Sequence, residues 1–102
     1  MDLSEFGRFS DPALLIMASL AGGEKHGYAM MEDIETMAGV RLGAGTLYGA
    51  LSRLEQAGLI EALPADERRR PYRLTAVGAA SLRQALASLE KFVSLGLKRL
   101  TA

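Results

Sequence analysis

The chain has 102 residues, of which 49% are hydrophobic, so it can bury one core of modest size. Its 12 basic and 12 acidic residues cancel, and the absence of cysteine excludes disulfides, thiolate nucleophiles and cysteine zinc sites. A single histidine and no converging polar cluster leave little from which to build a catalytic centre, so we expect no enzyme, no cofactor and no metal site.

The first clear helix signal is Asp11-Pro12, because an aspartate caps free amides and a proline fits the first helical turn. We expect this helix to run from Pro12 to Leu20 at the centre of the domain, since it is apolar nearly all round. It is too short to span a bilayer, and the acidic N-terminus lacks the basic region of a signal peptide. We therefore expect a soluble, cytoplasmic protein. An apolar stripe in residues 1–9 is expected to cover the core or a partner.

A second helix is expected from His26 or Gly27 to Ala38, closed by Gly39. The apolar stripe expected to face the core comprises Met30, Ile34 and Met37. The acidic residues expected to face water are Glu32, Asp33 and Glu35. His26 has no second histidine or cysteine beside it, so we interpret it as a helix-start or exposed residue. Tyr28, at the entry of this helix, is placed to reach a phosphate oxygen.

A third helix is expected between Leu42 and Gly58, where Gly58 stands at the position of a helix-ending glycine. Its core face carries Leu47, Leu51 and Leu54 at helical spacing. The opposite face is small and polar, so another surface can approach its backbone closely. That face comprises Gly45, Gly49, Ser52 and Gln56, flanked by Thr46, Tyr48 and Arg53. No lysine follows the glycines at the start of this helix, so a nucleotide-binding P-loop is rejected.

A basic hairpin follows the third helix. Residues Leu59 to Leu63 are expected as one strand, Ala65 to Arg70 as the turn and Pro71 to Thr75 as the returning strand. Four arginines fall within six positions, namely Arg68, Arg69, Arg70 and Arg73. Taken alone, such a run fits a solvated hairpin tip equally well. Following a helix with a bare polar face, it favours a winged helix-turn-helix, in which helix and wing both meet DNA.

The last expected helix begins after a Thr75 cap and runs from Ala76 to about Arg99. Its apolar stripe comprises Leu82, Leu86, Leu89 and Val93, and Leu100 continues it after Gly96. About 24 residues span about 36 Å, which is longer than a small three-helix core can cover. We therefore favour a dimerisation helix over one that only closes the same domain.

With these residues in view, the chain resembles the PadR family of bacterial transcriptional regulators, specifically its short members. The fragments that carry the resemblance are Lys25-His26-Gly27-Tyr28, Gly45-Thr46-Leu47-Tyr48 with Leu51, Arg53 and Leu54, then Gly58-Leu59-Ile60, and Arg70-Pro71-Tyr72-Arg73-Leu74-Thr75 with Gly78. The resemblance implies a winged-helix domain, a C-terminal dimerisation helix and repression by operator binding. It also implies release of the DNA by an effector, which in such proteins is often a small hydrophobic molecule or a phenolic acid.

The chain departs from the family pattern at two places in the third helix. Family members often have serine-proline where this chain has Gly43-Ala44, so this helix is expected to lack a side-chain cap. A proline commonly follows the tyrosine, and here Gly49 stands in its place. The chain also has no tryptophan for the aromatic stacking that some short members use to bind ligands.

The sequence therefore predicts an α+β, mostly helical protein, with a winged helix-turn-helix DNA-binding domain in residues 1–75 and a C-terminal dimerisation helix in residues 76–102. We expect a transcriptional regulator, most simply a repressor, that binds double-stranded operator DNA as a homodimer. The residues expected to contact DNA are Tyr28, Thr46, Tyr48, Gly49, Ser52, Arg53, Arg68, Arg69 and Arg70. The residues expected at the dimer contact are Leu82, Leu86, Leu89, Val93 and Leu100.

The chief alternative is a winged-helix module that holds a protein on the same face without specific DNA binding. Net neutrality and the acidic residues Asp66 and Glu67 beside the wing arginines favour it slightly. The uninterrupted run from Arg68 to Arg70 opposes it.

Overall fold

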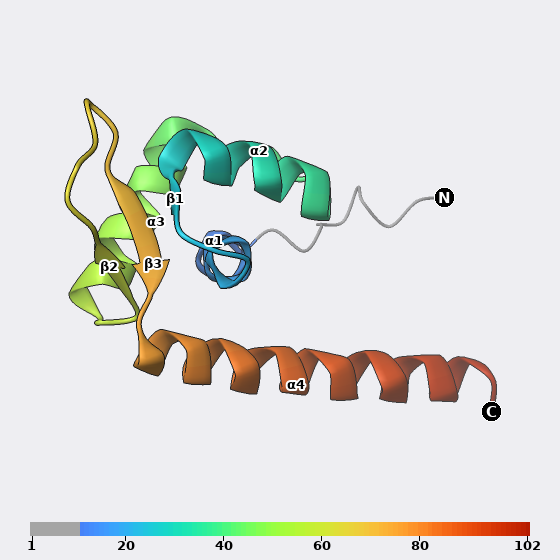
Figure 1. The fold of residues 1–102 in the computed structure, drawn as a ribbon. Coiled ribbons are helices and arrows are strands. Elements are labelled where there is room, and N and C mark those ends of the chain that lie inside the picture. Colours follow the sequence, from blue (N-terminus) through green and yellow to red (C-terminus); the bar gives the residue numbers. More distant parts are fainter. Residues whose placement is uncertain (1–10) are drawn as a thin grey trace.

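Residues 11–102 are described by the computed structural model, and they form four helices and one small sheet (Figure 1). In chain order the elements are α1 (Pro12–Ala21), β1 (Lys25–His26), α2 (Gly27–Ala38), α3 (Ala44–Gln56), β2 (Ile60–Ala62), β3 (Pro71–Leu74) and α4 (Ala76–Leu100). The strands form an antiparallel sheet in the order β1-β3-β2. The predicted α+β, mostly helical class with a winged arrangement is confirmed. The stripe expected in residues 1–9 lies outside the described residues.

Side-chain caps set the starts of three helices. Asp11 accepts a hydrogen bond at 3.1 Å from the Ala13 amide, and Thr75 Oγ1 accepts one at 3.0 Å from the Gly78 amide. His26 Nδ1 accepts the Ala29 amide at 3.4 Å, which confirms its interpretation as a helix-start residue. The start of α3 has no side-chain cap, as the Gly43-Ala44 departure predicted.

The core is built around α1, which packs against α2, α3, α4 and β3. Its side chains are buried nearly all round, and the leucines of α3 and Ile60 of β2 close over them. Met30 and Ile34 are buried as predicted, but Met37 is 48% exposed and its inward assignment was wrong. Met31 and Ala38 pack against the core instead, so the buried stripe of α2 is rotated toward them and leaves Met37 at its edge.

Asp33 was expected to face water, and its side chain does so only in part, because it also binds the end of α1. Its Oδ2 accepts a hydrogen bond at 2.6 Å from Oγ of Ser19, which is fully buried in α1. Lys25 Nζ donates to the Ser19 carbonyl at 2.5 Å and lies 3.9 Å from Asp33. This polar group joins the end of α1 to α2 and fixes the path of β1. The two-residue strand β1 was not predicted, because two residues carry no periodic signal.

The wing is the β2–β3 hairpin, residues 60–74. Glu61 pairs with Arg73 across the strands, and the two side chains form an ion pair. Both strands are shorter than predicted, although the Leu63 amide still donates to the Pro71 carbonyl at 2.9 Å. At the tip, Asp66 and Arg69 exchange two backbone hydrogen bonds, and Glu67 between them has a left-handed φ of 56°.

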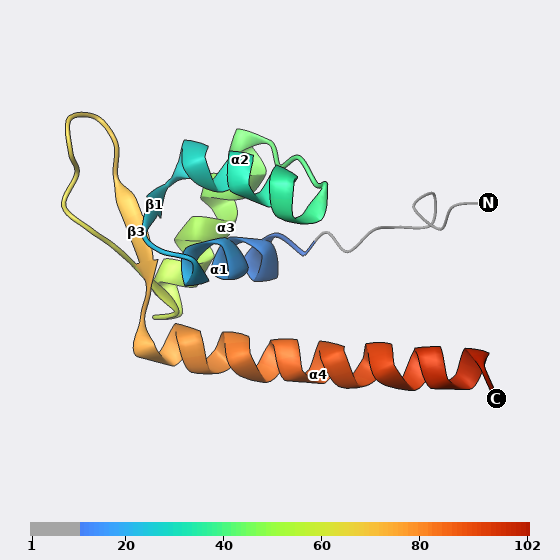
Figure 2. The same ribbon diagram turned by 45° about the vertical axis from the view of Figure 1, so that its right-hand side comes forward.

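Helix α4 leaves the sheet and passes beneath α1, and its second half extends beyond the rest of the described structure (Figure 2). Leu82 was assigned to the dimer contact, but it is only 5% exposed because it packs into the core beneath α1 and β3. Large apolar side chains further along the helix are exposed, namely Leu86, Phe92, Val93, Leu95, Leu97 and Leu100. Among residues 11–102 no helix is both long and apolar enough to cross a membrane.

Gly78 is required where α4 meets the loop before β2. A β-carbon at this position would overlap the backbone carbonyl of Leu59, which cannot move aside as a flexible side chain could. We expect Gly78→Ala to destabilise the fold by at least about 1–3 kcal/mol, as overpacking does in well-packed interiors. Thermal or urea unfolding measures the change.

Gly45→Ala on α3 is the matched control, because Gly45 lies outside the proposed dimer contact. Apart from the backbone of its own helix, no described atom lies within 4 Å of a β-carbon built there, so this variant should gain up to about 0.5–1 kcal/mol from helix propensity. Equal stability of the two variants would show that Gly78 does not lie against the Leu59 carbonyl.

Candidate nucleic-acid interface

The outer face of α3 is bare and open. Thr46, Ser52 and Arg53 are exposed, and a β-carbon added at Gly45 would meet no atom of the described residues within 4 Å. At Gly49 the nearest atom to such a β-carbon is Nη1 of Arg53, at 3.6 Å. The Arg53 side chain therefore lies back along the helix toward the level of Gly49. As predicted, these small and polar residues share the face opposite the buried leucines.

The arginines of the wing differ in whether another side chain already binds them. Arg73 Nε lies 2.5 Å from Glu61 Oε1, so this ion pair joins the two strands of the hairpin and the arginine is not available to a ligand. Arg69 Nη1 lies 3.3 Å from His26 Nε2 at the start of α2. Within residues 11–102, Arg68, Arg70 and Arg53 have no acidic partner. These unpaired guanidinium groups are available to an anionic ligand.

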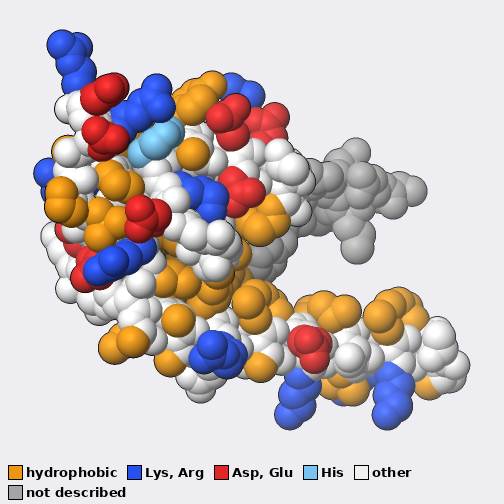
Figure 3. Space-filling view, viewed as in Figure 1, with side chains coloured by type: hydrophobic (Ala, Val, Ile, Leu, Met, Phe, Trp, Pro, Cys, Tyr) orange, Lys and Arg blue, Asp and Glu red, His pale blue; other side chains and the backbone are white. Residues whose placement is uncertain are grey.

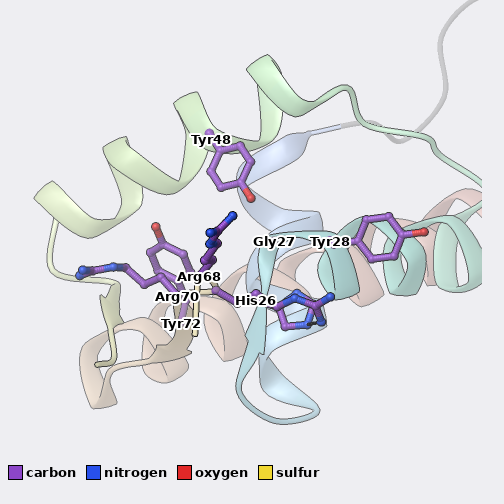
Figure 4. Close-up of a pocket in the computed structure, with 8 residues that line it drawn as sticks. His26, Gly27, Tyr28, Tyr48, Arg68, Arg70 and Tyr72 are labelled. Atoms are coloured by element: carbon purple, nitrogen blue, oxygen red, sulfur yellow. Dashed lines mark hydrogen bonds between the residues drawn. The ribbon is translucent and has the colours of Figure 1, made fainter. Parts of the chain in front are cut away.

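A pocket of about 230 Å³ lies between the start of α2, the middle of α3 and the wing (Figure 4). We call it the tyrosine–arginine pocket, and its lining residues are His26, Gly27, Tyr28, Tyr48, Arg68, Arg69, Arg70 and Tyr72. Three fragments far apart in the sequence therefore meet at one place. In a space-filling view, basic side chains also lie near the histidine at the wing side of the molecule (Figure 3).

Gly27 decides where Tyr48 lies. A β-carbon at Gly27 would fall 2.5 Å from the Tyr48 hydroxyl oxygen and 2.9 Å from Cζ of the same ring. The Tyr48 ring thus reaches from α3 onto the first residue of α2 (Figure 4). Tyr28 is 61% exposed, and its ring points away from Tyr48 and Tyr72 (Figure 4).

Tyr72 was missed in the choice of site residues, although it belongs to the Arg70-Pro71-Tyr72 fragment that carried the family resemblance. Burial raises the pKa of its phenol above the usual 10.0, and the negative charge of Glu55 raises it further. Arg70 opposes this shift, and Tyr48 adds to it slightly. The Tyr72 hydroxyl, which like any phenol keeps its proton at neutral pH, is available as a hydrogen-bond donor.

The predicted DNA-contacting residues thus fall into two neighbouring groups. Thr46, Gly49, Ser52 and Arg53 lie on the outer face of α3, whereas Tyr28, Tyr48 and Arg68–Arg70 line the pocket. The predicted dimer residues lie apart from both groups, on α4. Within residues 11–102, no group of three or more histidine, cysteine or acidic side chains is arranged to hold a metal ion.

Residues 16–84 match the model of the transcriptional regulator PadR-like family. A protein of Streptomyces fradiae, described as an uncharacterized 37.1 kDa protein in a transposon, is 42% identical over 84 residues, which are 82% of this chain. The chain spans only 24% of the length of that protein.

Solved structures give the same result. A transcriptional regulator from Clostridium thermocellum has a TM-score of 0.74 and 29% identity, with 85% of this chain and 87% of that chain covered. RosR from H. salinarum has a TM-score of 0.72 and 28% identity, with 90% and 82% covered. A PadR family transcription regulator from Clostridium difficile, 24% identical with a TM-score of 0.73, shares the fold over 89% of this chain and 98% of its own.

Proposed function

Because the chain belongs to the PadR-like family of transcriptional regulators, we propose that it binds operator DNA in the cytoplasm as a homodimer and represses transcription. Membership of this family makes it a transcriptional regulator rather than an enzyme. The observation that carries the proposal is the open outer face of α3 beside a wing whose Arg68 and Arg70 have no acidic partner within residues 11–102.

In this proposal α3 enters the major groove. Gly45 and Gly49 add no side chain to its outer face, so the helix backbone can approach the base edges closely. Thr46, Ser52 and Arg53 supply the hydroxyl and guanidinium groups that commonly contact bases and phosphates. The buried leucines of α3 hold the helix on the core and make no contact with DNA.

The wing then follows the backbone or the minor groove. Arginine suits this role because its planar guanidinium group binds phosphate oxygens in pairs and fits a narrow minor groove. Net neutrality of the whole chain is no obstacle, since salt leaves only nearby charges to act on a phosphate. Glu61 is already neutralised by Arg73, and Glu35 by Arg41 at 3.2 Å.

We propose that residues 76–102, which contain α4, form the dimerisation segment of the homodimer. The first two turns of this helix are covered by α1 and β3, but Leu86, Val93 and Leu100 are exposed on the same stripe as the buried Leu82. Leu89, on the same stripe, is half-buried. Apolar side chains are visible along the whole helix, and basic side chains project from its lower edge (Figure 3). An exposed apolar stripe of this length calls for a second copy.

Release by a small hydrophobic effector completes the proposal. A hollow of about 310 Å³ between α1, β3 and α4 is lined by Ala21, Leu74, Ala79, Leu82, Arg83 and Leu86. Five of these six side chains are apolar, and ligand pockets of small molecules are usually of this size and character. A molecule seated there would touch both the winged-helix core and the dimerisation helix.

A protein-docking module remains the second candidate. The zero net charge and the acidic tip residues Asp66 and Glu67 favour it, because such a tip repels phosphate. The unpaired arginines beside that tip favour DNA.

Substitution of Gly49 by leucine tests the choice of helix face. The site has room, and leucine is the better helix former by about 0.8–1 kcal/mol, so the variant should melt at or above the wild-type temperature. On DNA, the same side chain should clash with the groove and abolish specific binding to an operator selected from genomic fragments. Gly49→Ala carries a smaller side chain at the same position and should lose an intermediate amount of operator affinity. A stable Gly49→Leu protein with wild-type operator affinity would place a different face in the groove.

A further inference from the structure

The tyrosine–arginine pocket presents donors without acceptors. The hydroxyl groups of Tyr48 and Tyr72 make no hydrogen bond within residues 11–102, and the guanidinium groups of Arg68 and Arg70 have no acidic partner there. No carboxylate lines the pocket. Arg69 is engaged with His26, but the other arginines and the two phenols leave unsatisfied donors and positive charge in a concave site of about 230 Å³, which fits an oxyanion.

The direction of Tyr48 separates this pocket from the groove-facing surface of α3. Its ring lies against Gly27, and its hydroxyl group points toward the start of α2 (Figure 4). The glycine at position 27 is what makes room for that placement, because a methyl group there would push the ring out. Tyr48 is therefore built into the pocket.

We propose that the tyrosine–arginine pocket seats one phosphodiester group of the operator backbone, with the hydroxyl groups of Tyr48 and Tyr72 and the guanidinium group of Arg68 donating to its oxygens. The inference rests on the proposed DNA binding and makes Tyr48 a phosphate ligand rather than a reader of bases. Gly27 is a positioning residue that acts through Tyr48. A phenol is protonated over the neutral range, and burial raises the pKa of the Tyr72 phenol further above it, so that hydroxyl group can donate to the phosphate.

Loss of a tyrosine hydroxyl group and loss of an arginine should change the salt dependence of DNA affinity differently. A neutral hydroxyl group releases no counterion, so its loss should lower affinity without changing the salt slope, whereas each lost arginine contact should lower the slope by about 0.9. A phosphate ligand also carries no sequence information, so its loss should weaken binding to all duplexes by the same factor.

The experiment compares Tyr48→Phe, Tyr72→Phe and the double variant by fluorescence anisotropy, with a selected operator and a mixed-sequence duplex. Each single variant should bind both duplexes about tenfold more weakly, at an unchanged salt slope, because hydrogen bonds to charged groups are strong. Gly27→Ala should reproduce the Tyr48→Phe loss while Tyr48 is still present. Thr36→Ala, which removes an exposed hydroxyl group elsewhere on α2, is the control and should bind as wild type does. Thermal melts check that all variants fold.

A second arm uses inorganic phosphate without DNA. In wild type, phosphate should shift the NMR signals of the Tyr48 and Tyr72 rings saturably, and the double variant should show no saturable shift of the Phe signals. A double variant that binds both duplexes as tightly as wild type overturns the proposal, and so does a loss confined to the operator. If wild type binds phosphate but no duplex, the DNA-binding function fails and the pocket serves a free phosphorylated ligand instead. Absence of binding to both probes would overturn the pocket as well.

Discussion

Alanine in place of Arg68, Arg69 and Arg70 together is expected to weaken binding to every DNA duplex on the order of a hundredfold at physiological salt, because each phosphate contact releases bound counterions. Three lost contacts should reduce the magnitude of the log–log slope of affinity against salt by about 2.7. Anisotropy titrations of one duplex over a series of salt concentrations measure both quantities.

Single variants and a matched arginine sharpen this prediction. Each wing arginine replaced alone should lower the slope by about 0.9. Arg41→Ala is the control, because Arg41 is already paired with Glu35 and lies outside the tyrosine–arginine pocket, so the slope should stay unchanged. A triple variant with the wild-type slope would mean that the wing does not touch phosphate.

Glutamate at Leu86 and Val93 together is expected to convert a micromolar dimer to a monomer. A buried leucine contributes roughly 1.5–3 kcal/mol, and a charge introduced into the same contact adds the cost of its desolvation. A monomer binds only one half-site, so operator affinity should fall by roughly 10²–10⁴-fold, which is the usual gain from linking two binding modules. Sedimentation equilibrium and operator titration measure the two effects.

Ser94→Glu supplies the control on the same helix. Ser94 lies about 120° around α4 from the buried Leu82, so it is outside the apolar stripe and the variant should remain dimeric. Either a stable wild-type monomer or a dimeric Leu86→Glu, Val93→Glu protein would contradict the assignment of this stripe.

Local chemistry explains why much of the fold could be predicted from the sequence. Asp11 and Thr75 begin their helices through hydrogen bonds to backbone amides two or three residues away, so the signal lies within the motif itself. Gly39 and Gly58 end theirs with positive φ values of 67° and 76°. The leucine spacing of α3 identified both its buried face and, by opposition, its open face.

Tertiary contacts explain what was missed. The strand β1 is held by pairing with β3 and by Lys25, which binds the end of α1. Both contacts are made with residues of other elements, so the two residues of β1 alone could not predict them. Leu82 shares the helical stripe of Leu86, and only the position of α1 decides that one is buried and the other exposed. The tyrosine–arginine pocket unites three distant fragments, so no local pattern could predict that Tyr48 would lie against Gly27.

The proposed regulation of transcription depends on binding of DNA by α3 and the wing. Its most direct test is a salt-dependent titration of the full chain with an operator recovered from genomic fragments and with a mixed-sequence duplex. We predict saturable binding of two chains per operator, clear preference over the mixed sequence, and a slope of about −0.9 for each phosphate contacted. Absence of binding, or equal and salt-insensitive affinity for both duplexes, would contradict the account.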